Sequence, residues 1–299
     1  MMMDNSTPNA PAYFTYPGKL EGYKKGKPIL TALLGVVLFA VFMVALVILC
    51  GVVAVLEGKD MMTLLQSFQG GYDTLDVYSG AGALLSMGNL AVIIPALFLA
   101  MKITKERPIH TLTSSRGGWN RIFFIRALFL ALLVNGLPQV VIAAATGGFS
   151  HIQFRYTIPG FIIFVLLVPL QCIAEEYLFR GFIGQTIASW LKNPIPAILI
   201  STVFFMISHA YNTLGLIGTF VAGTVLCLVT WRTKGLEVAC ALHIVNNFFA
   251  FLLSGIGVAA VTSNEGIVDF VEQLMIYAVF LALVFVLDQK KGWWTDATK

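Results

Sequence analysis

Long apolar runs with almost no charge in their interiors constrain this 299-residue chain more than any other feature. Crossing the hydrocarbon core of a membrane takes about 20 consecutive apolar residues, each adding about 1.5 Å of helix. Eight segments qualify, at residues 29–56, 79–101, 122–146, 157–189, 195–211, 213–231, 236–258 and 268–288. The fourth is too long for one simple crossing, and the fifth is short. The pattern predicts an all-α, polytopic membrane bundle of about eight transmembrane helices.

The composition excludes a soluble class. Hydrophobic residues make up 58% of the chain and charged residues 11%, whereas soluble domains carry about 25% charged residues. The cysteines at positions 50, 172, 227 and 240 stand in apolar stretches without CxxC spacing, so we interpret them as small buried side chains. The net charge of +4 is modest and indicates no nucleic-acid partner.

Charge alternates between successive connecting segments. Lysines and arginines gather before the first span, after the second and sixth, and in the tail, whereas the segments after the first and seventh spans are mainly acidic. Basic loops favour the cytoplasmic side, so both termini are predicted to be cytoplasmic. The predicted organisation is a polar segment at 1–28, a bundle at 29–289 and a tail at 290–299. The first apolar run is too long for a signal peptide. The expected location is a bacterial plasma membrane.

Three local expectations accompany this topology. The polar residues 1–18 are expected to be disordered. Trp293 and Trp294, beside two lysines, are typical of an aromatic anchor at the membrane interface. Glu237 follows a basic turn and is expected to form a surface salt bridge there.

Two adjacent glutamates, Glu175 and Glu176, stand inside the fourth apolar segment. A carboxylate in hydrocarbon costs several kcal/mol or becomes protonated, so both are candidates for function. Arg180 follows Glu176 at i,i+4 in the favourable order and is predicted to pair with it; a buried ion pair that only fixes helix packing is the alternative. Neighbouring helical residues point about 100° apart. The two glutamates are therefore expected not to face one point, which leaves Glu175 to face a different cavity.

His209 and Glu175 are related by a predicted helical hairpin that turns at Lys192. Glu175 lies 17 residues before Lys192 and His209 lies 17 after it. In an antiparallel pair these positions come level, so a carboxylate would face an imidazole; a packing histidine is the alternative. His209 also lies about 25 Å of helix from Lys192. It therefore reaches the depth of His243 only if the hairpin projects into the cytoplasm.

A third polar group, His243, Asn246 and Asn247, stands in the seventh segment. His243 and Asn247 share one helix face at i,i+4, and Asn246 lies nearly on that face. Hydrogen bonding between helices is the alternative interpretation, because amides and imidazoles often join membrane helices in this way. With Glu175 and His209 in the same half of the chain, we favour a functional role.

These residues, in this order, resemble the CPBP family of intramembrane endopeptidases, which includes CAAX prenyl-protein proteases and bacteriocin-processing homologues. Its motifs are EExxxR, FxxxH and HxxxN, matched here by Glu175–Arg180, Phe205–His209 and His243–Asn247. The resemblance covers residues 160–255. It implies a helix bundle with a polar cavity open to the cytoplasm. It also implies Glu175 as general base, His209 as its partner in holding the water, His243 and Asn247 as oxyanion donors, and Glu176 and Arg180 as support.

The residues suit peptide hydrolysis, which needs a base near working pH, a placed water and donors aimed at the developing oxyanion. The expected partners are membrane lipid and a membrane-associated or lipidated peptide, with no cofactor. A zinc hydrolase is the alternative from the same residues, since Glu175, His209 and His243 could supply three ligands. A transporter relaying protons and a non-catalytic adaptor are the alternatives from other classes.

Overall fold

The computed structural model describes residues 12–69, 74–259 and 264–294, and this part of the chain is a bundle of helices without a named strand. The main elements are α1 (Lys27–Leu56), α3 (Gly80–Ala91), α4 (Ile93–Thr104), α6 (Arg121–Ala131), α7 (Leu137–Ala145), α8 (Ile158–Glu176), α9 (Gln185–Leu191), α10 (Pro194–Ile207), α11 (Thr213–Thr233), α12 (Glu237–Gly255) and α13 (Ile267–Lys291). The short elements are η1 (Pro17–Lys19), α2 (Met61–Gln69), α5 (His110–Thr113), η2 (Leu132–Gly136), η3 (Gly148–His151) and η4 (Tyr177–Gly184). The all-α membrane bundle predicted from the sequence is confirmed.

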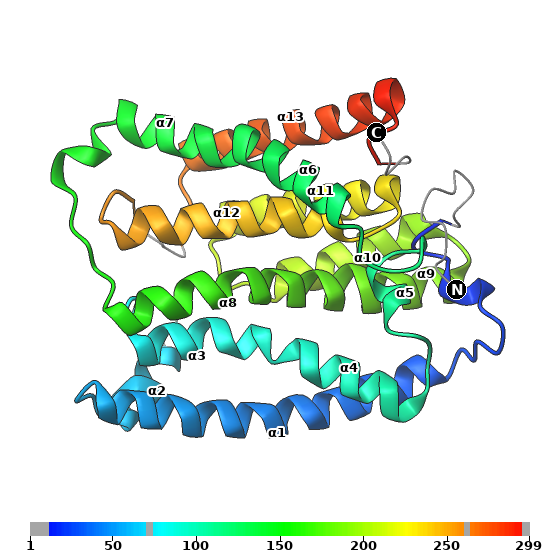
Figure 1. Ribbon diagram of the computed structural model, residues 1–299, viewed down its shortest axis with the longest axis horizontal. Helices are drawn as coiled ribbons and strands as arrows, with labels where there is room; N and C mark the ends of the chain where they lie inside the picture. Colours follow the sequence, from blue (N-terminus) through cyan, green and yellow to red (C-terminus); the bar gives the residue numbers. More distant parts are fainter. Residues whose placement is uncertain (1–11, 70–73, 260–263, 295–299) are drawn as a thin grey trace.

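Seven helices, counting continuous runs as one, are long and apolar enough to cross a membrane in the part of the chain that the structure describes. The fifth predicted span is shorter than expected, because α10 has 14 residues, about 21 Å against a hydrocarbon core of about 30 Å. Its start is fixed by Asn193, whose side chain caps the helix, and by Pro194. Figure 1 shows both described ends of the chain at one end of the bundle, which requires an even number of passes along it, α10 included. The assignment of that end to the cytoplasm stays a prediction.

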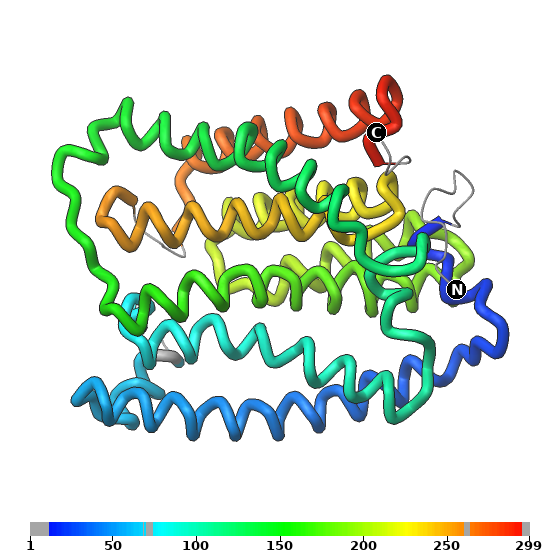
Figure 2. Tube along the Cα trace, in the orientation of Figure 1, coloured from blue at the N-terminus to red at the C-terminus, as the bar shows by residue number. Residues whose placement is uncertain are grey.

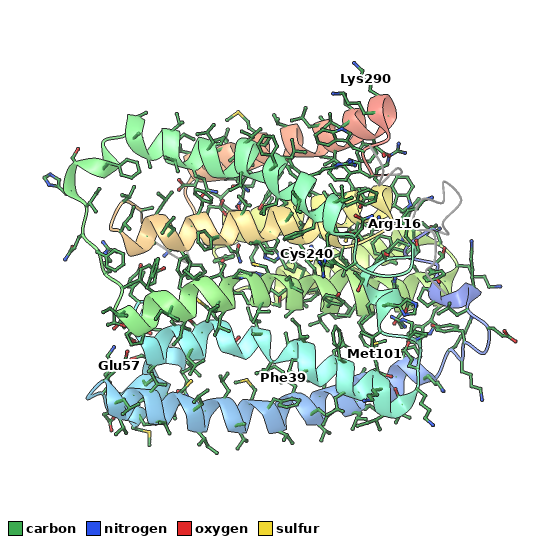
Figure 3. The ribbon with its side chains drawn as sticks, viewed as in Figure 1. Phe39, Glu57, Met101, Arg116, Cys240 and Lys290 are labelled. Carbon is green, nitrogen blue, oxygen red and sulfur yellow. The ribbon has the colours of Figure 1, made fainter. Side chains whose placement is uncertain are left out.

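The helices are arranged around α12. This helix packs against α6, α8 and α11, and its first nine residues are all buried. On one side α8 packs against α3, and α1 lies along α3 and α4 (Figure 2). On the other side α13 packs against α11. In Figure 3 Arg116 and Lys290 lie toward the end that holds the termini and Glu57 toward the opposite end, in keeping with the alternation of charge along the sequence.

Two stretches of π-helix interrupt the spans. The run from Arg121 to Ala145 contains η2, and the run from Ile158 to Leu191 contains the eight-residue η4 directly after Glu176. Apolar periodicity predicts neither stretch. π-Helical turns are rare in proteins, and those that occur are often found at functional sites. Here each stretch carries a buried polar residue, Asn135 in η2 and Arg180 in η4.

The expectation of disorder over residues 1–18 is wrong for the part that the structure describes. Tyr13 and Phe14 are fully buried, and Tyr13 donates a hydrogen bond to the Leu112 carbonyl. The Gln185 side chain donates to the Tyr13 carbonyl at 3.2 Å. The segment is polar on average, but it contains two aromatic side chains whose burial stabilises the fold. Residues 1–11 lie outside the described residues.

The expected interfacial anchor is wrong for Trp294, which is 1% exposed. Its indole N–H donates to the Val284 carbonyl at 3.0 Å, and its ring meets Phe123 edge-on. The chain turns back after α13 at Gly292, which has a positive φ of 61°. This turn carries Trp294 into the gap between α6 and α13.

Candidate functional site

Glu176 and Arg180 form a fully buried ion pair. The Arg180 Nη1 donates to Glu176 Oε1 at 3.1 Å, which confirms the pairing predicted from the i,i+4 spacing. Its Nη2 donates to the Gly223 carbonyl at 3.1 Å on α11, and its guanidinium lies 4.3 Å from the ring centre of Phe205 on α10. Arg180 therefore joins α8, α10 and α11 around one carboxylate.

His243 contacts both glutamates. Its Nδ1 lies 2.8 Å from Glu176 Oε1, and its Nε2 lies 3.4 Å from Glu175 Oε2. This corrects the expectation that Glu175 faces a different cavity. The two carboxylates do leave the helix in different directions, but the imidazole lies between them and offers a nitrogen on each edge. Glu175 and His243 are 4% and 7% exposed, so the cluster is inside the bundle.

His209 lies just beyond the end of α10. Its Nδ1 is 2.8 Å from the Phe205 carbonyl and donates to it, since a carbonyl oxygen can only accept. Nε2 is then the ring nitrogen left to accept a hydrogen bond. The ring packs edge-on against Phe205 with centroids 4.7 Å apart, and it stacks on Tyr211.

Phe205 connects the two histidines. Its ring centroid lies 6.0 Å from that of His243 as well as next to His209. Among the described residues no hydrogen bond joins His209 to Glu175 directly. The hairpin does have the predicted register one turn away, because the rings of Phe179 and Phe205, each 13 residues from Lys192, are in edge contact.

The tip of the hairpin between α9 and α10 extends past the start of α12. His209 and His243 can lie at the same depth only if it does so. The Gln185 side chain donates to the Thr111 carbonyl at 2.9 Å, and the Leu236 N–H donates to the Thr113 carbonyl at 2.9 Å. The start of α9 is thus close in level to the start of α12. Lys192 lies seven residues farther along, about 10 Å beyond that level.

Four amides continue the cluster on its other side. Asn247 Nδ2 lies 3.4 Å from His243 Nε2, and Asn246 Nδ2 donates to Asn247 Oδ1 at 3.2 Å. Asn135, from η2, donates to Asn246 Oδ1 at 3.2 Å and accepts from Gln139. Asn135 and Gln139 were not among the predicted site residues, because an amide carries no charge and does not stand out in an apolar span as an ionisable group does. The signal was present as two amides four residues apart in an apolar segment.

Glu237 is fully buried and belongs to a separate network, which corrects the expected surface salt bridge. Arg116 Nη2 lies 2.7 Å from Glu237 Oε2, and the Asn120 N–H donates to Glu237 Oε1 at 2.8 Å. The nearby basic turn uses another acid, since Arg232 pairs with Asp288 at 2.7 Å. Glu237 therefore anchors the start of α12 to the segment before α6.

The arrangement does not fit zinc. Among the described residues no three His, Cys, Asp or Glu side chains are grouped to hold a metal ion. Each nitrogen of His243 is already within contact distance of a protein side chain, Glu176 at Nδ1 and Glu175 and Asn247 at Nε2. A zinc ligand needs a free imidazole lone pair and two further ligands at similar distance.

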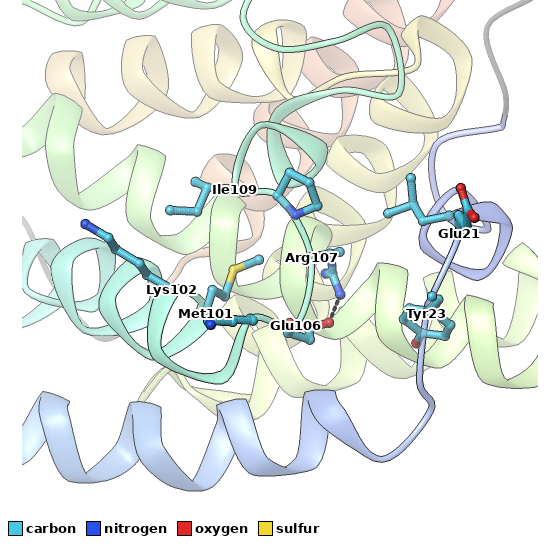
Figure 4. Close-up of a pocket in the computed structure, with 11 residues that line it drawn as sticks. Glu21, Tyr23, Met101, Lys102, Glu106, Arg107 and Ile109 are labelled. Carbon is cyan, nitrogen blue, oxygen red and sulfur yellow. Dashed lines mark hydrogen bonds and ion pairs between the residues drawn. The ribbon is translucent and has the colours of Figure 1, made fainter.

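A cavity of about 670 Å³ lies elsewhere, between the N-terminal segment and the end of α4 (Figure 4). Tyr23, Lys102 and the adjacent Glu106 and Arg107 are among its lining residues, and Glu106 pairs with Arg107 inside it. Burial raises the pKa of the Glu106 carboxyl. None of the residues of the His243 cluster, its two glutamates, Arg180, His209 and the neighbouring amides, lines this cavity, so it is separate from the candidate site.

Comparison with known proteins bears on the same part of the chain. Residues 156–249 match the family described as type II CAAX prenyl endopeptidase, Rce1-like. The chain is also 31% identical over 169 residues to the uncharacterized protein YyaK of Bacillus subtilis (strain 168). That alignment covers 52% of this chain and 56% of the relative, so the chain spans little more than half the length of the relative it matches. No solved structure matches the chain.

Proposed function

Residues 156–249 belong to the type II CAAX prenyl endopeptidase family, and from this membership we propose that the chain is an intramembrane endopeptidase. The reaction is hydrolysis of a peptide bond in a membrane-associated or lipidated peptide. One observation carries the proposal: within the bundle, His243 contacts Glu175 through one ring nitrogen and Glu176 through the other. Buried acids and imidazoles in contact can move protons near neutral pH.

Glu175 is the general base in this proposal. It takes a proton from a water that attacks the carbonyl carbon of the scissile bond. His209 holds that water with Nε2, the ring nitrogen left free when Nδ1 donates to the Phe205 carbonyl. The near-complete burial of Glu175 supports this role, because a water beside it is shielded from bulk solvent.

His243 and Asn247 stabilise the oxyanion that forms. The 3.4 Å approach of Glu175 Oε2 to His243 Nε2 lets the proton pass from the acid to the ring. The ring then carries an N–H at Nε2, and the Asn247 amide, no longer donating to Nε2, is free to donate to the oxyanion. Collapse of the intermediate returns the proton to the leaving amine.

Glu176 and Arg180 support the site without contacting substrate. Glu176 accepts from His243 Nδ1, which stabilises the imidazolium formed during the reaction. Arg180 supplies the counter-charge for the fully buried Glu176 carboxylate. We propose a bacterial plasma membrane as the location, with both termini and the opening of the site on the cytoplasmic side.

The test is cleavage by the purified full chain in lipid vesicles. The substrates are a prenylated peptide ending in a CAAX sequence, the same peptide without the prenyl group, and an apolar membrane-spanning peptide. Glu175→Gln should lower the rate by about 100-fold or more, whereas the matched exposed variant Glu21→Gln should not change it. A Glu175→Gln protein that unfolds at the wild-type temperature and cleaves at the wild-type rate would exclude this mechanism. The preference between the two CAAX peptides shows whether the prenyl group is recognised.

A further inference from the structure

Four side-chain amides form a continuous chain of hydrogen bonds that ends on the His243 imidazole. Gln139 Nε2 donates to Asn135 Oδ1, and Asn135 Nδ2 donates to Asn246 Oδ1 at 3.2 Å. Asn246 Nδ2 donates to Asn247 Oδ1 at 3.2 Å, and Asn247 Nδ2 lies 3.4 Å from His243 Nε2. This series of hydrogen bonds starts on α7, passes through η2 and crosses to α12. We call these four residues the amide relay.

The amide relay has one direction. An amide has its donor and its acceptor on opposite branches, so an amide that accepts from one neighbour donates to the next. The three links between amides donate toward His243, and the Asn247 Nδ2 that lies 3.4 Å from His243 Nε2 can only donate. Reversing any one amide would set two acceptors or two donors against each other. In a membrane interior that mismatch is costly, because water is not there to compensate.

The far side of the imidazole agrees with this direction. Glu176 Oε1 lies 2.8 Å from Nδ1, and a carboxylate oxygen accepts, so Nδ1 carries the proton. In the neutral form of the ring the lone pair is then at Nε2, which is what a donating Asn247 requires. The relay and Glu176 therefore favour the same tautomer from opposite edges of the ring.

We propose that Asn135 and Gln139 are positioning residues that orient the Asn247 amide and thereby fix the tautomer of His243. This inference rests on the proposed hydrolase function. Asn247 must present N–H groups toward the site to serve as an oxyanion donor, and Nε2 must be unprotonated to receive the proton from Glu175. The relay sets both conditions before substrate arrives, so little reorganisation is needed during the reaction.

An interaction that only held two helices together would have a simpler arrangement of side chains. Two helices are held by any amide pair across their interface, with no need for an ordered sequence of four. The relay instead passes through a fully buried residue, Asn135, in the π-helical stretch η2, and each later amide is fixed by the one before it. Its last donor is within reach of a ring that also contacts Glu175.

The test uses Asn135→Asp, which keeps the shape of the side chain but removes its donor. A carboxylate at 135 forces Asn246 to donate toward it, and this reversal passes through Asn247 to His243. Nitrogen-15 spectra of protein with labelled histidines report the tautomer, and the His243 signals among the four histidines are identified by their loss in His243→Gln. We expect a change from Nδ1–H toward Nε2–H. We also expect kcat to fall by about 10- to 100-fold while KM changes less than about twofold.

The matched control is Asn89→Asp, which places the same carboxylate in a half-buried position on another spanning helix, α3. It should leave the His243 spectrum unchanged. If Asn135→Asp does not fold, Gln139→Glu makes the same reversal from the half-buried start of the relay. A wild-type His243 spectrum in a folded Asn135→Asp or Gln139→Glu protein overturns the proposal. The spectrum decides this even if no peptide is cleaved, so a failure of the relay and a failure of the hydrolase function are told apart.

Discussion

Arg180 donates to Glu176 Oε1 at 3.1 Å, and both side chains are completely shielded from solvent. Because Glu176 also contacts His243 and Arg180 also binds the Gly223 carbonyl, this pair connects the candidate site to three helices. Its removal should therefore affect folding as well as chemistry.

We predict that Arg180→Met lowers the free energy of unfolding by about 3–5 kcal/mol, because Glu176 is left buried without a counter-charge. Thermal unfolding in detergent measures the loss. The double variant Arg180→Met with Glu176→Gln should recover part of it. The control is Lys59→Met, which breaks the exposed Lys59–Asp76 pair and should cost about 0–1 kcal/mol. Equal losses for the two single variants would contradict the prediction.

Gly160 lets α8 lie close against the backbone just before α3. A Cβ at this position would lie 2.0 Å from the Tyr78 carbonyl oxygen, whereas a Cβ at Gly35 on α1 would meet nothing closer than Ala100 at 3.9 Å. Gly160→Ala should lower the free energy of unfolding by about 1–3 kcal/mol through overpacking. Gly35→Ala should be neutral or stabilising by up to about 1 kcal/mol. Unfolding temperatures of the two alanine variants test the difference, and a stable Gly160→Ala protein would argue against this close approach.

The buried N-terminal aromatics should be needed for stability. Phe14 is fully buried and lies against Gly184 in η4. Phe14→Ala is expected to cost about 3–5 kcal/mol, and Tyr16→Ala, at a half-buried neighbour, much less. Thermal unfolding gives the comparison. A Phe14→Ala protein as stable as wild type would mean that the N-terminal segment does not pack on the hairpin.

The start of α2 should depend on pH. The Asp60 carboxylate accepts from the Thr63 N–H at 2.8 Å and from its hydroxyl at 2.9 Å, and these bonds lower the pKa of Asp60. A carboxyl whose folded pKa lies below its unfolded pKa stabilises above the unfolded value and loses that contribution as pH falls through the folded value. Hydrogen exchange in α2, corrected for the intrinsic rate, should rise over that acidic interval.

Two variants check the origin of this pH dependence. Asp60→Asn keeps an accepting oxygen and should protect α2 equally across the same interval. Asp60→Ala should leave α2 poorly protected at every pH. An unchanged pH dependence in Asp60→Asn would assign the effect to another group.

Interactions within one helix were predictable from the sequence, and those between helices were predictable only in part. The Glu176–Arg180 pair follows from helical spacing, and the ring contact between Phe179 and Phe205 follows from the position of Lys192. The contact of His243 with both glutamates does not follow, because spacing along α8 says nothing about where α12 lies. A flat ring with a nitrogen on each of two edges can contact two side chains that diverge from one helix.

Other features were missed for identifiable physical reasons. Asn135 and Gln139 carry no charge, so the cost of burying a charge does not single them out, although an unpartnered amide is also costly in a membrane. Tyr13 and Phe14 are two aromatics in a polar segment, too few to produce a periodic pattern. The roles assigned to Glu175, His209, His243 and Asn247 stay predictions.

The π-helical stretch η4 joins α8 to α9 in one continuous helical run. The number of residues in η4 therefore sets the direction in which the side chains of α9 point relative to those of α8. Every residue added to or removed from a helix turns its C-terminal part by about 100°. Deleting one residue between Tyr177 and Gly184 would therefore rotate α9 and its packing face while leaving Glu175 and Glu176 in place. Length in this stretch should be held more strictly than side-chain identity, and a natural insertion or deletion here would mark a chain whose hairpin packs differently.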